Sequence, residues 1–228
     1  TVGRIPIEAD SAIEELIDRL DSEKGLLLSS SYEYPGRYTR WDMGFVNPPL
    51  SITSSKNVVD VRALNDRGKI LLDVIYNAVR NVTGAIEVTQ SEDVVSCRIE
   101  QVNRRFEEEQ RSRQPSTFSV VRSIVELFAG ADPHLGLYGA FGYDLAFQFE
   151  PMEMRLERPA DQRDLLLYIP DQLIVVDHQG AVAERVSYDF SIGGRATAPF
   201  ERAGEILPYL ADKSFVSHRD HAPGSYAN

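Results

Sequence analysis

The sequence is short of cysteine and of basic residues, and it has no long apolar run. Its one cysteine, Cys97, cannot form an internal disulfide, and one thiol among four scattered histidines does not make a zinc site. Lys and Arg total 24 against 35 Asp and Glu, and the net charge of −11 opposes binding to nucleic-acid phosphates and anionic lipid. No run approaches the about 20 apolar residues of a membrane-spanning helix, and no signal-peptide pattern opens the chain. We therefore expect a cytoplasmic protein whose partners include neither nucleic acid nor a membrane.

Catalytic patterns are also lacking. No serine stands in a nucleophile-elbow context, and the glycines of residues 136–144, GLYGAFGYD, lack the Lys and Ser/Thr of a phosphate-binding loop. Asp177 and His178 are neighbours in an expected strand, so their side chains point to opposite faces and do not form an acid–base dyad. The acidic residues 107–109 lie among arginines at helical spacing, which favours an exposed, salt-bridged face over a cation site. We expect no catalytic residue in this chain.

What is present is apolar periodicity, within a hydrophobic content of 43% that is enough for a core. The pattern predicts an α+β fold of mostly antiparallel strands with covering helices. Expected helices are 10–23, with a capping box of Ser11 and Glu14, then 69–81, 117–129 and 200–210. Expected strands are 26–33, 40–46, 50–53, 58–64, 85–89, 94–99, 165–167, 172–176 and 181–189, the last two joined by a hairpin turn at 178–180. We expect the strands between 26 and 64 to form one antiparallel meander, and the charged residues 100–114 to be a solvated helix or linker.

Two tracts combine unusual residues. In residues 136–144 the glycines lie in an aromatic-rich strand, which indicates close packing against another layer of backbone. Residues 26–40, LLLSSSYEYPGRYTR, place three hydroxyls at a strand end beside a Pro-Gly turn and two arginines. Hydroxyls and main-chain groups can bind the ammonium and carboxylate of a zwitterion, and arginine supplies a bidentate fork for the carboxylate. The same residues also fit a polar strand end followed by a solvated turn.

Five motifs together resemble the N-terminal region of the chorismate-utilising anthranilate synthases. In chain order they are LLSSS (27–31), PGRY (35–38), RALNDRG (62–68), GLYGAFGYD (136–144) and PDQLIVVD (170–177). The form SSYEYPGRYTRWD is similar to the long enzymes in which the chorismate subunit and a glutamine amidotransferase are fused. The resemblance implies a part of a four-layer α/β/β/α sandwich.

The resemblance also implies a function. Residues 1–212 would be the tryptophan-sensing region, and residues 213–228 a linker into the chorismate-binding domain, which holds the chorismate and Mg²⁺ ligands. The first residue is Thr1 rather than Met, which also suggests a segment of a longer protein. The whole enzyme would convert chorismate and glutamine, or ammonia, to anthranilate and pyruvate, with the C-terminal domain and an amidotransferase domain or subunit as partners.

The effector site is implied residue by residue. Leu27-Leu-Ser-Ser30 occupies the place of the leucine-leucine-glutamate-serine motif with which many members of the family hold L-tryptophan. Ser30, Ser29 and Arg40 are therefore the expected ligands of the effector, although Ser29 replaces a glutamate. Three alternatives remain: the same region of aminodeoxychorismate or isochorismate synthase, a stand-alone amino-acid-binding regulatory module, and a purely structural domain.

Overall fold

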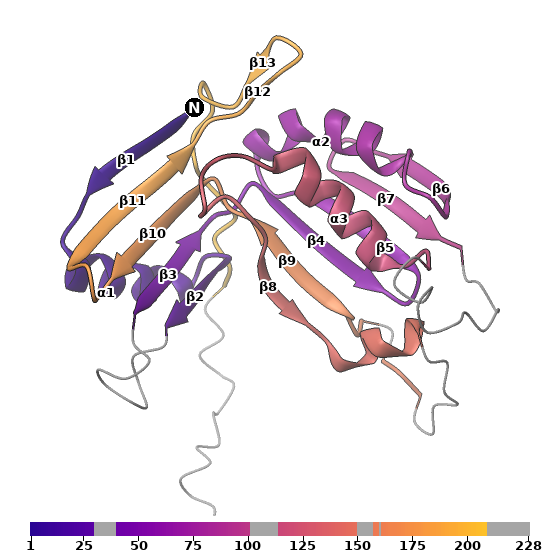
Figure 1. Cartoon of the computed structure of the whole chain (residues 1–228), viewed down its shortest axis with the longest axis horizontal. Helices are drawn as coiled ribbons and strands as arrows, with labels where there is room; N and C mark the ends of the chain where they lie inside the picture. The colour runs from indigo at the N-terminus through magenta and orange to yellow at the C-terminus, as the bar shows by residue number, and fades with distance from the viewer. Residues whose placement is uncertain (30–39, 101–113, 150–156, 160, 209–228) are drawn as a thin grey trace, which may run out of the picture.

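The computed structural model describes residues 1–29, 40–100, 114–149, 157–159 and 161–208, which form two antiparallel sheets set at an angle to each other, as Figure 1 shows. The predicted α+β class with mostly antiparallel strands is confirmed. The expected continuation of the first predicted strand beyond Ser29, the expected helix or linker at 101–113, and the predicted linker at 213–228 lie outside the described residues.

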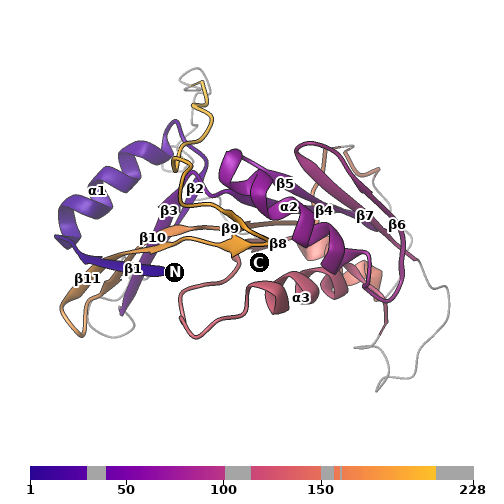
Figure 2. The same cartoon turned by 90° about the horizontal axis from the view of Figure 1, so that it is seen from above.

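A five-stranded sheet contains both the first and the last long strands of the described chain. Its order is β1 (Val2–Pro6), β11 (Val182–Tyr188), β10 (Gln172–Asp177), β3 (Trp41–Val46) and β2 (Gly25–Ser29). Helix α1 (Ala9–Leu20) covers one face of this sheet (Figure 2). Strand β1 was not predicted, because all five of its residues are exposed and it has no alternating pattern.

A six-stranded sheet holds the larger core. Its order is β6 (Ala85–Gln90), β7 (Val94–Ile99), β5 (Val58–Ala63), β4 (Leu50–Ser55), β9 (Leu165–Ile169) and β8 (Tyr138–Phe141). Helices α2 (Asp66–Val79) and α3 (Thr117–Phe128) pack on each other and on this sheet. Residues such as Leu50, Ile52, Leu71, Ile75 and Ile124 are fully buried between them. A 3₁₀ helix (η2, Tyr143–Gln148) follows β8, and a short hairpin, β12 (Ser191–Ile192) and β13 (Arg195–Ala196), follows β11.

The predicted meander of residues 26–64 is wrong, because its strands belong to two sheets. Strands β2 and β3 pair in the five-stranded sheet, whereas β4 and β5 pair in the six-stranded sheet. The chain crosses between them at Asn47, which has a φ of 51°, followed by Pro48 and Pro49. Proline has no N–H for a strand ladder, so it ends pairing at this point. The segment 47–49, predicted as a turn within one sheet, is therefore the crossover between the two sheets.

Two helix predictions also need correction. The cap of α1 is Glu8 instead of Ser11, since the Glu8 carboxylate accepts from the backbone N–H groups of Asp10 at 3.2 Å and Ser11 at 2.7 Å. The expected helix 200–210 is absent from its described part, residues 200–208. There the backbone bonds to other elements: the carbonyl of Phe200 accepts from Arg67, and the N–H of Leu207 donates to the carbonyl of Ser22 at 2.7 Å. These long-range bonds replace the hydrogen bonds that a helix would make.

The glycine-rich tract does mark a close approach, although the neighbour differs from the prediction. A Cβ atom on Gly139 would lie 2.0 Å from the backbone oxygen of Leu166. Leu166 belongs to β9, the strand beside β8 in the same sheet, and not to another layer. Glycine is therefore required at this position for pairing within the sheet.

Candidate functional site

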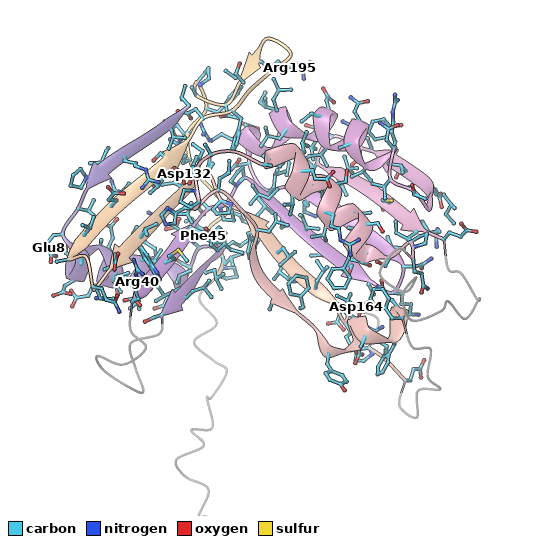
Figure 3. The ribbon with its side chains drawn as sticks, in the orientation of Figure 1. Glu8, Arg40, Phe45, Asp132, Asp164 and Arg195 are labelled. Carbon is cyan, nitrogen blue, oxygen red and sulfur yellow. The ribbon has the colours of Figure 1, made fainter. Side chains whose placement is uncertain are left out.

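The predicted effector residues lie at one end of the β2–β3 pair. In the ladder Ser29 is directly opposite Asp42, and this register places both side chains on one face of the sheet. Arg40 directly precedes β3 and is two residues from Asp42 in the chain. Figure 3 shows Arg40 at the outer end of the five-stranded sheet, and Phe45 nearer the junction of the two sheets. The structure thus brings Ser29 and Arg40 to the same strand end, whereas Ser30 lies outside the described residues.

Arg40 is held loosely. Its side chain is 52% exposed, and its Nη2 atom lies 3.5 Å from the Asp177 carboxylate. Its guanidinium carbon lies 4.8 Å from the centre of the Trp41 ring, which places the cation over the aromatic face. An exposed ion pair of this length contributes little to stability. The guanidinium can therefore leave Asp177 for a ligand at small cost.

Asp177 is fixed mainly by the hairpin turn that follows it. Its carboxylate accepts from the backbone N–H groups of Gln179 and Gly180, each at 3.1 Å. These bonds, the one from Gly180 foremost, together with Arg40 hold the pKa of Asp177 below its ordinary value. The predicted hairpin at 178–180 is confirmed, as is the absence of an Asp177–His178 dyad, because His178 turns to a different carboxylate.

That carboxylate, Asp42, was missed by the sequence analysis. Its side chain is only 8% exposed, and its Oδ2 atom lies 2.8 Å from Nε2 of His178. Its Oδ1 atom is buried and has no hydrogen-bond partner within the part of the chain that the structure describes. The signal was present in the alternation of β3: Asp42 occupies the same face as Gly44, against which Leu16 of α1 packs. An acidic residue at a position facing a covering helix is unusual enough to mark a site.

The opposite face of β3 is aromatic. The ring of Trp41 lies edge-on to His134, with 6.1 Å between the centroids. Phe45 contacts Tyr138 of β8 and Tyr168 of β9, each with a centroid separation of 5.9 Å. These pairs join the five-stranded sheet to the six-stranded sheet. Strand β3 therefore presents Asp42 on the face toward α1 and aromatic side chains toward the other sheet.

A second cluster joins the two sheets through one buried arginine. All five N–H groups of Arg67 donate hydrogen bonds, although its side chain is 1% exposed. Its acceptors are the carboxylates of Asp171 and Asp189 and the carbonyls of Tyr188, Thr197 and Phe200. Arg67 comes from the RALNDRG motif and Asp171 from the PDQLIVVD motif. Two of the motifs that carry the resemblance therefore meet in a buried ion pair.

A cavity of about 160 Å³ lies between α1 and the five-stranded sheet. Its walls include Arg19, Gln172, Arg185 and Arg202, with Gly44 in its floor. None of Ser29, Ser30 and Arg40 lines it, so the predicted effector residues do not converge on this cavity.

The described residues include no group of three or more His, Cys, Asp or Glu side chains placed to hold a metal ion. Among the same residues, no helix is both long and apolar enough to cross a membrane.

Comparison with known proteins identifies relatives along nearly the whole chain. A protein of Azospirillum brasilense named anthranilate synthase is 43% identical over 221 residues, which are 96% of this chain and 30% of that protein. Anthranilate synthase component 1 of Haemophilus influenzae is 27% identical over 194 residues, 84% of this chain and 37% of that protein. The component 1 of Vibrio cholerae is 27% identical over 172 residues, 73% of this chain and 32% of that protein. No family model matches the chain.

The chain thus spans about a third of the length of the curated relatives it matches. In the Azospirillum protein the matched part is N-terminal. The resemblance that the five motifs predicted is confirmed: the chain is a homologue of the N-terminal part of anthranilate synthases.

Proposed function

We propose that this chain is the tryptophan-sensing N-terminal region of an anthranilate synthase of tryptophan biosynthesis. The observation that carries the proposal is the β2–β3 strand end, where Ser29, Arg40 and the buried carboxylate of Asp42 lie within two residue steps of one another. An amino acid carries one positive and one negative group, and this strand end offers hydrogen-bonding groups of both signs. The homologues named anthranilate synthase supply the enzyme in which such a sensor acts.

Strand β2 also offers main-chain groups. It is the last strand of its sheet and pairs with β3 on one side only among the described strands. An edge strand presents N–H and C=O groups that can bind a ligand or a further segment of chain. Ser30 is the next residue of the chain, and we propose its hydroxyl as a further ligand of the effector.

Regulation follows from differential binding. The enzyme as a whole would convert chorismate and glutamine, or ammonia, to anthranilate and pyruvate. Tryptophan would favour a low-activity arrangement of the sensing and chorismate-binding regions by binding that arrangement more tightly. Residues 1–212 would form the sensing region, and residues 213–228 would lead into the chorismate-binding domain, which would hold the substrate and Mg²⁺. As an enzyme of amino-acid biosynthesis, the protein would work in the cytoplasm.

The size of the relatives supports the fused form of the enzyme. The 221 matched residues are 30% of the Azospirillum protein, whereas 194 matched residues are 37% of the Haemophilus component 1. The former is therefore longer by about 200 residues, the size of a further domain. We propose that this chain likewise belongs to a polypeptide that also contains the glutamine amidotransferase.

The four-layer sandwich is also proposed for the whole enzyme. Each sheet of the described chain has helices on one face, and the inner aromatic contacts of Phe45 join the sheets where they converge. The edges at β2 and β8 have no outer neighbour among the described strands. Strands from the C-terminal region would extend these edges and complete the two central layers.

The test uses the full-length enzyme. Anthranilate fluorescence is followed from chorismate, Mg²⁺ and ammonia, with and without L-tryptophan, for the wild type, Ser30→Phe and the control Ser91→Phe. Ser91 is exposed at a strand end of the six-stranded sheet, so it tests for a general effect of the added ring. We expect tryptophan to inhibit the wild type and the control but not Ser30→Phe. Turnover that tryptophan never inhibits would refute the sensor, and the absence of anthranilate would point to a sister chorismate enzyme.

A further inference from the structure

We propose that Asp42 accepts the ammonium group of the amino-acid effector. Ser29, the expected ligand on the neighbouring strand, has no charge with which to bind that group. The inference rests on the proposed effector site and adds to it a residue on the neighbouring strand. It starts from an unusual feature of β3: a carboxylate with one oxygen bonded and the other buried, with no donor among the described residues.

The two oxygens of Asp42 have different surroundings. Oδ2 lies 2.8 Å from Nε2 of His178, so this oxygen has a hydrogen-bond partner. Oδ1 is buried and finds no donor in the described part of the chain. A buried acceptor without a donor costs free energy, and the cost is greater for a charged group. An ammonium group would remove this cost, because it brings both a positive charge and N–H donors.

The position of Asp42 matches the place where a charge is missing. Ser29 is neutral, so its hydroxyl cannot supply a negative charge for an ammonium group. In the ladder Asp42 lies directly opposite Ser29 and on the same face. The negative charge at this end of the β2–β3 pair therefore comes from Asp42.

Arg40 provides the complementary charge. Its guanidinium lies over the Trp41 ring and beside the carboxylate of Asp177, which is directly opposite Trp41 in the ladder, so it contacts the face of β3 opposite to that of Asp42. Its ion pair with Asp177 is long and exposed, so the guanidinium is available for a carboxylate at this strand end. In this proposal the charge that holds the ammonium group is therefore that of Asp42, and Arg40 supplies a positive charge at the same strand end.

The role proposed for Asp42 predicts which ligands depend on it for binding. A ligand with a free ammonium group gains the contact with Asp42, whereas indole-3-propionate, which has the ring and the carboxylate but no ammonium, cannot gain it. The Asp42→Asn variant should therefore weaken the binding of L-tryptophan and leave the weaker binding of indole-3-propionate unchanged.

The experiment measures dissociation constants by calorimetry on the full-length enzyme, with L-tryptophan and indole-3-propionate as the two probes. For Asp42→Asn we expect L-tryptophan to bind about 10- to 100-fold more weakly, the usual loss for a hydrogen bond to a charged group. Indole-3-propionate should change by less than about 2-fold. The His178→Gln variant is the matched control, because it alters the same Asp42–His178 contact but keeps the carboxylate.

The outcomes separate the two proposals. If the wild type does not bind L-tryptophan, the effector site itself is wrong and the inference falls with it. If the wild type binds L-tryptophan and Asp42→Asn binds it equally well, only the role of Asp42 is wrong. A similar loss of L-tryptophan binding in Asp42→Asn and His178→Gln, or an equal loss of both ligands, would show that Asp42 only supports the structure, and would also overturn the inference. Thermal unfolding of each variant identifies any that fail to fold.

Discussion

The buried arginine at the junction of the sheets gives the sharpest prediction about stability. The change is Arg67→Met, which keeps the length of the side chain but removes its charge and all five of its hydrogen bonds. Of the two arginines that the structure describes beside Asp171, whose side chain is 3% exposed, Arg202 at 3.6 Å would then remain. The carbonyls of Thr197 and Phe200 would also lose the donor that they share in Arg67.

The expected cost follows from this geometry. Removing one partner of a buried ion pair costs about 3–5 kcal/mol, because the remaining charge stays buried. For a unit of this size that corresponds to a loss of roughly 6–20 °C in the unfolding temperature. Arg62→Met is the matched control, since Arg62 belongs to the same motif but its side chain is exposed on β5. A surface substitution of this kind should change stability by less than about 0.5 kcal/mol.

The assay must report on this region of a larger protein. Urea denaturation of the full-length enzyme, followed by hydrogen exchange and mass spectrometry, gives the opening free energy of peptides that cover β10 and residues 197–200. The double variant Arg67→Met, Asp171→Leu should be less destabilised than the sum of its single variants, because it leaves no unpaired charge. If Arg67→Met and Arg62→Met are equally stable in these peptides, the network does not hold the two sheets together and the reasoning is wrong.

Three smaller predictions concern single positions. Gly139→Ala should destabilise the protein by about 1–3 kcal/mol, because its Cβ atom would collide with the backbone of β9, whereas Gly136→Ala, with nothing within 4 Å, should be neutral in the same denaturation series. Burial raises the pKa of Cys97 to about 11, so iodoacetamide at pH 8 should leave the native thiol unmodified and label it only with denaturant; labelling without denaturant would contradict its burial. The pKa of Asp177 is lowered on folding, so its stabilising effect should be present above its unfolded pKa of about 3.9 and be lost as the pH falls through the folded value. The stability difference between wild type and Asp177→Asn should therefore shrink in acid, and a difference that is independent of pH would contradict the bonds from Arg40 and the turn.

The fold was predictable where local patterns determine it. Helix α3 (Thr117–Phe128) agrees with the predicted 117–129, since its apolar residues recur at helical spacing and its core side chains are buried. Strand β10 (Gln172–Asp177) and the turn after it agree with the predicted strand 172–176 and the predicted turn at 178–180. In these segments the local preference and the tertiary environment favour the same conformation.

The errors arose where distant residues decide the conformation. The predicted helix 200–210 was wrong because Arg67 and Ser22 bond the backbone of this segment, and no local pattern reports those bonds. The meander was wrong because the sequence around Asn47 does not show whether a turn joins strands of one sheet or of two. The short strand β1 was missed because β11 holds it by main-chain bonds, which are independent of the side chains.

The candidate site was predictable only in part, and for a related reason. Ser29 and Arg40 stand out in the chain because they belong to a polar tract beside a Pro-Gly turn. Asp42 does not, because its importance depends on the residue opposite it in the ladder and on a buried oxygen that has no donor in the described part of the chain. Strand register is a property of the pair of strands, so a single strand cannot reveal it.

The motifs that carry the resemblance therefore differ in what they imply. RALNDRG and PDQLIVVD meet in the Arg67–Asp171 pair, and the glycine-rich tract allows β8 to lie against β9, so these three motifs specify how the sheets are built. They predict the fold of any relative that contains them, whatever its effector. The ligand would instead be chosen at the end of β2 and β3, where Ser29 lies opposite the carboxylate of Asp42 in the ladder. A relative with all three structural motifs but no acidic residue at either ladder position should share the fold and fail to bind a free amino acid there, which tryptophan calorimetry on such a relative can test.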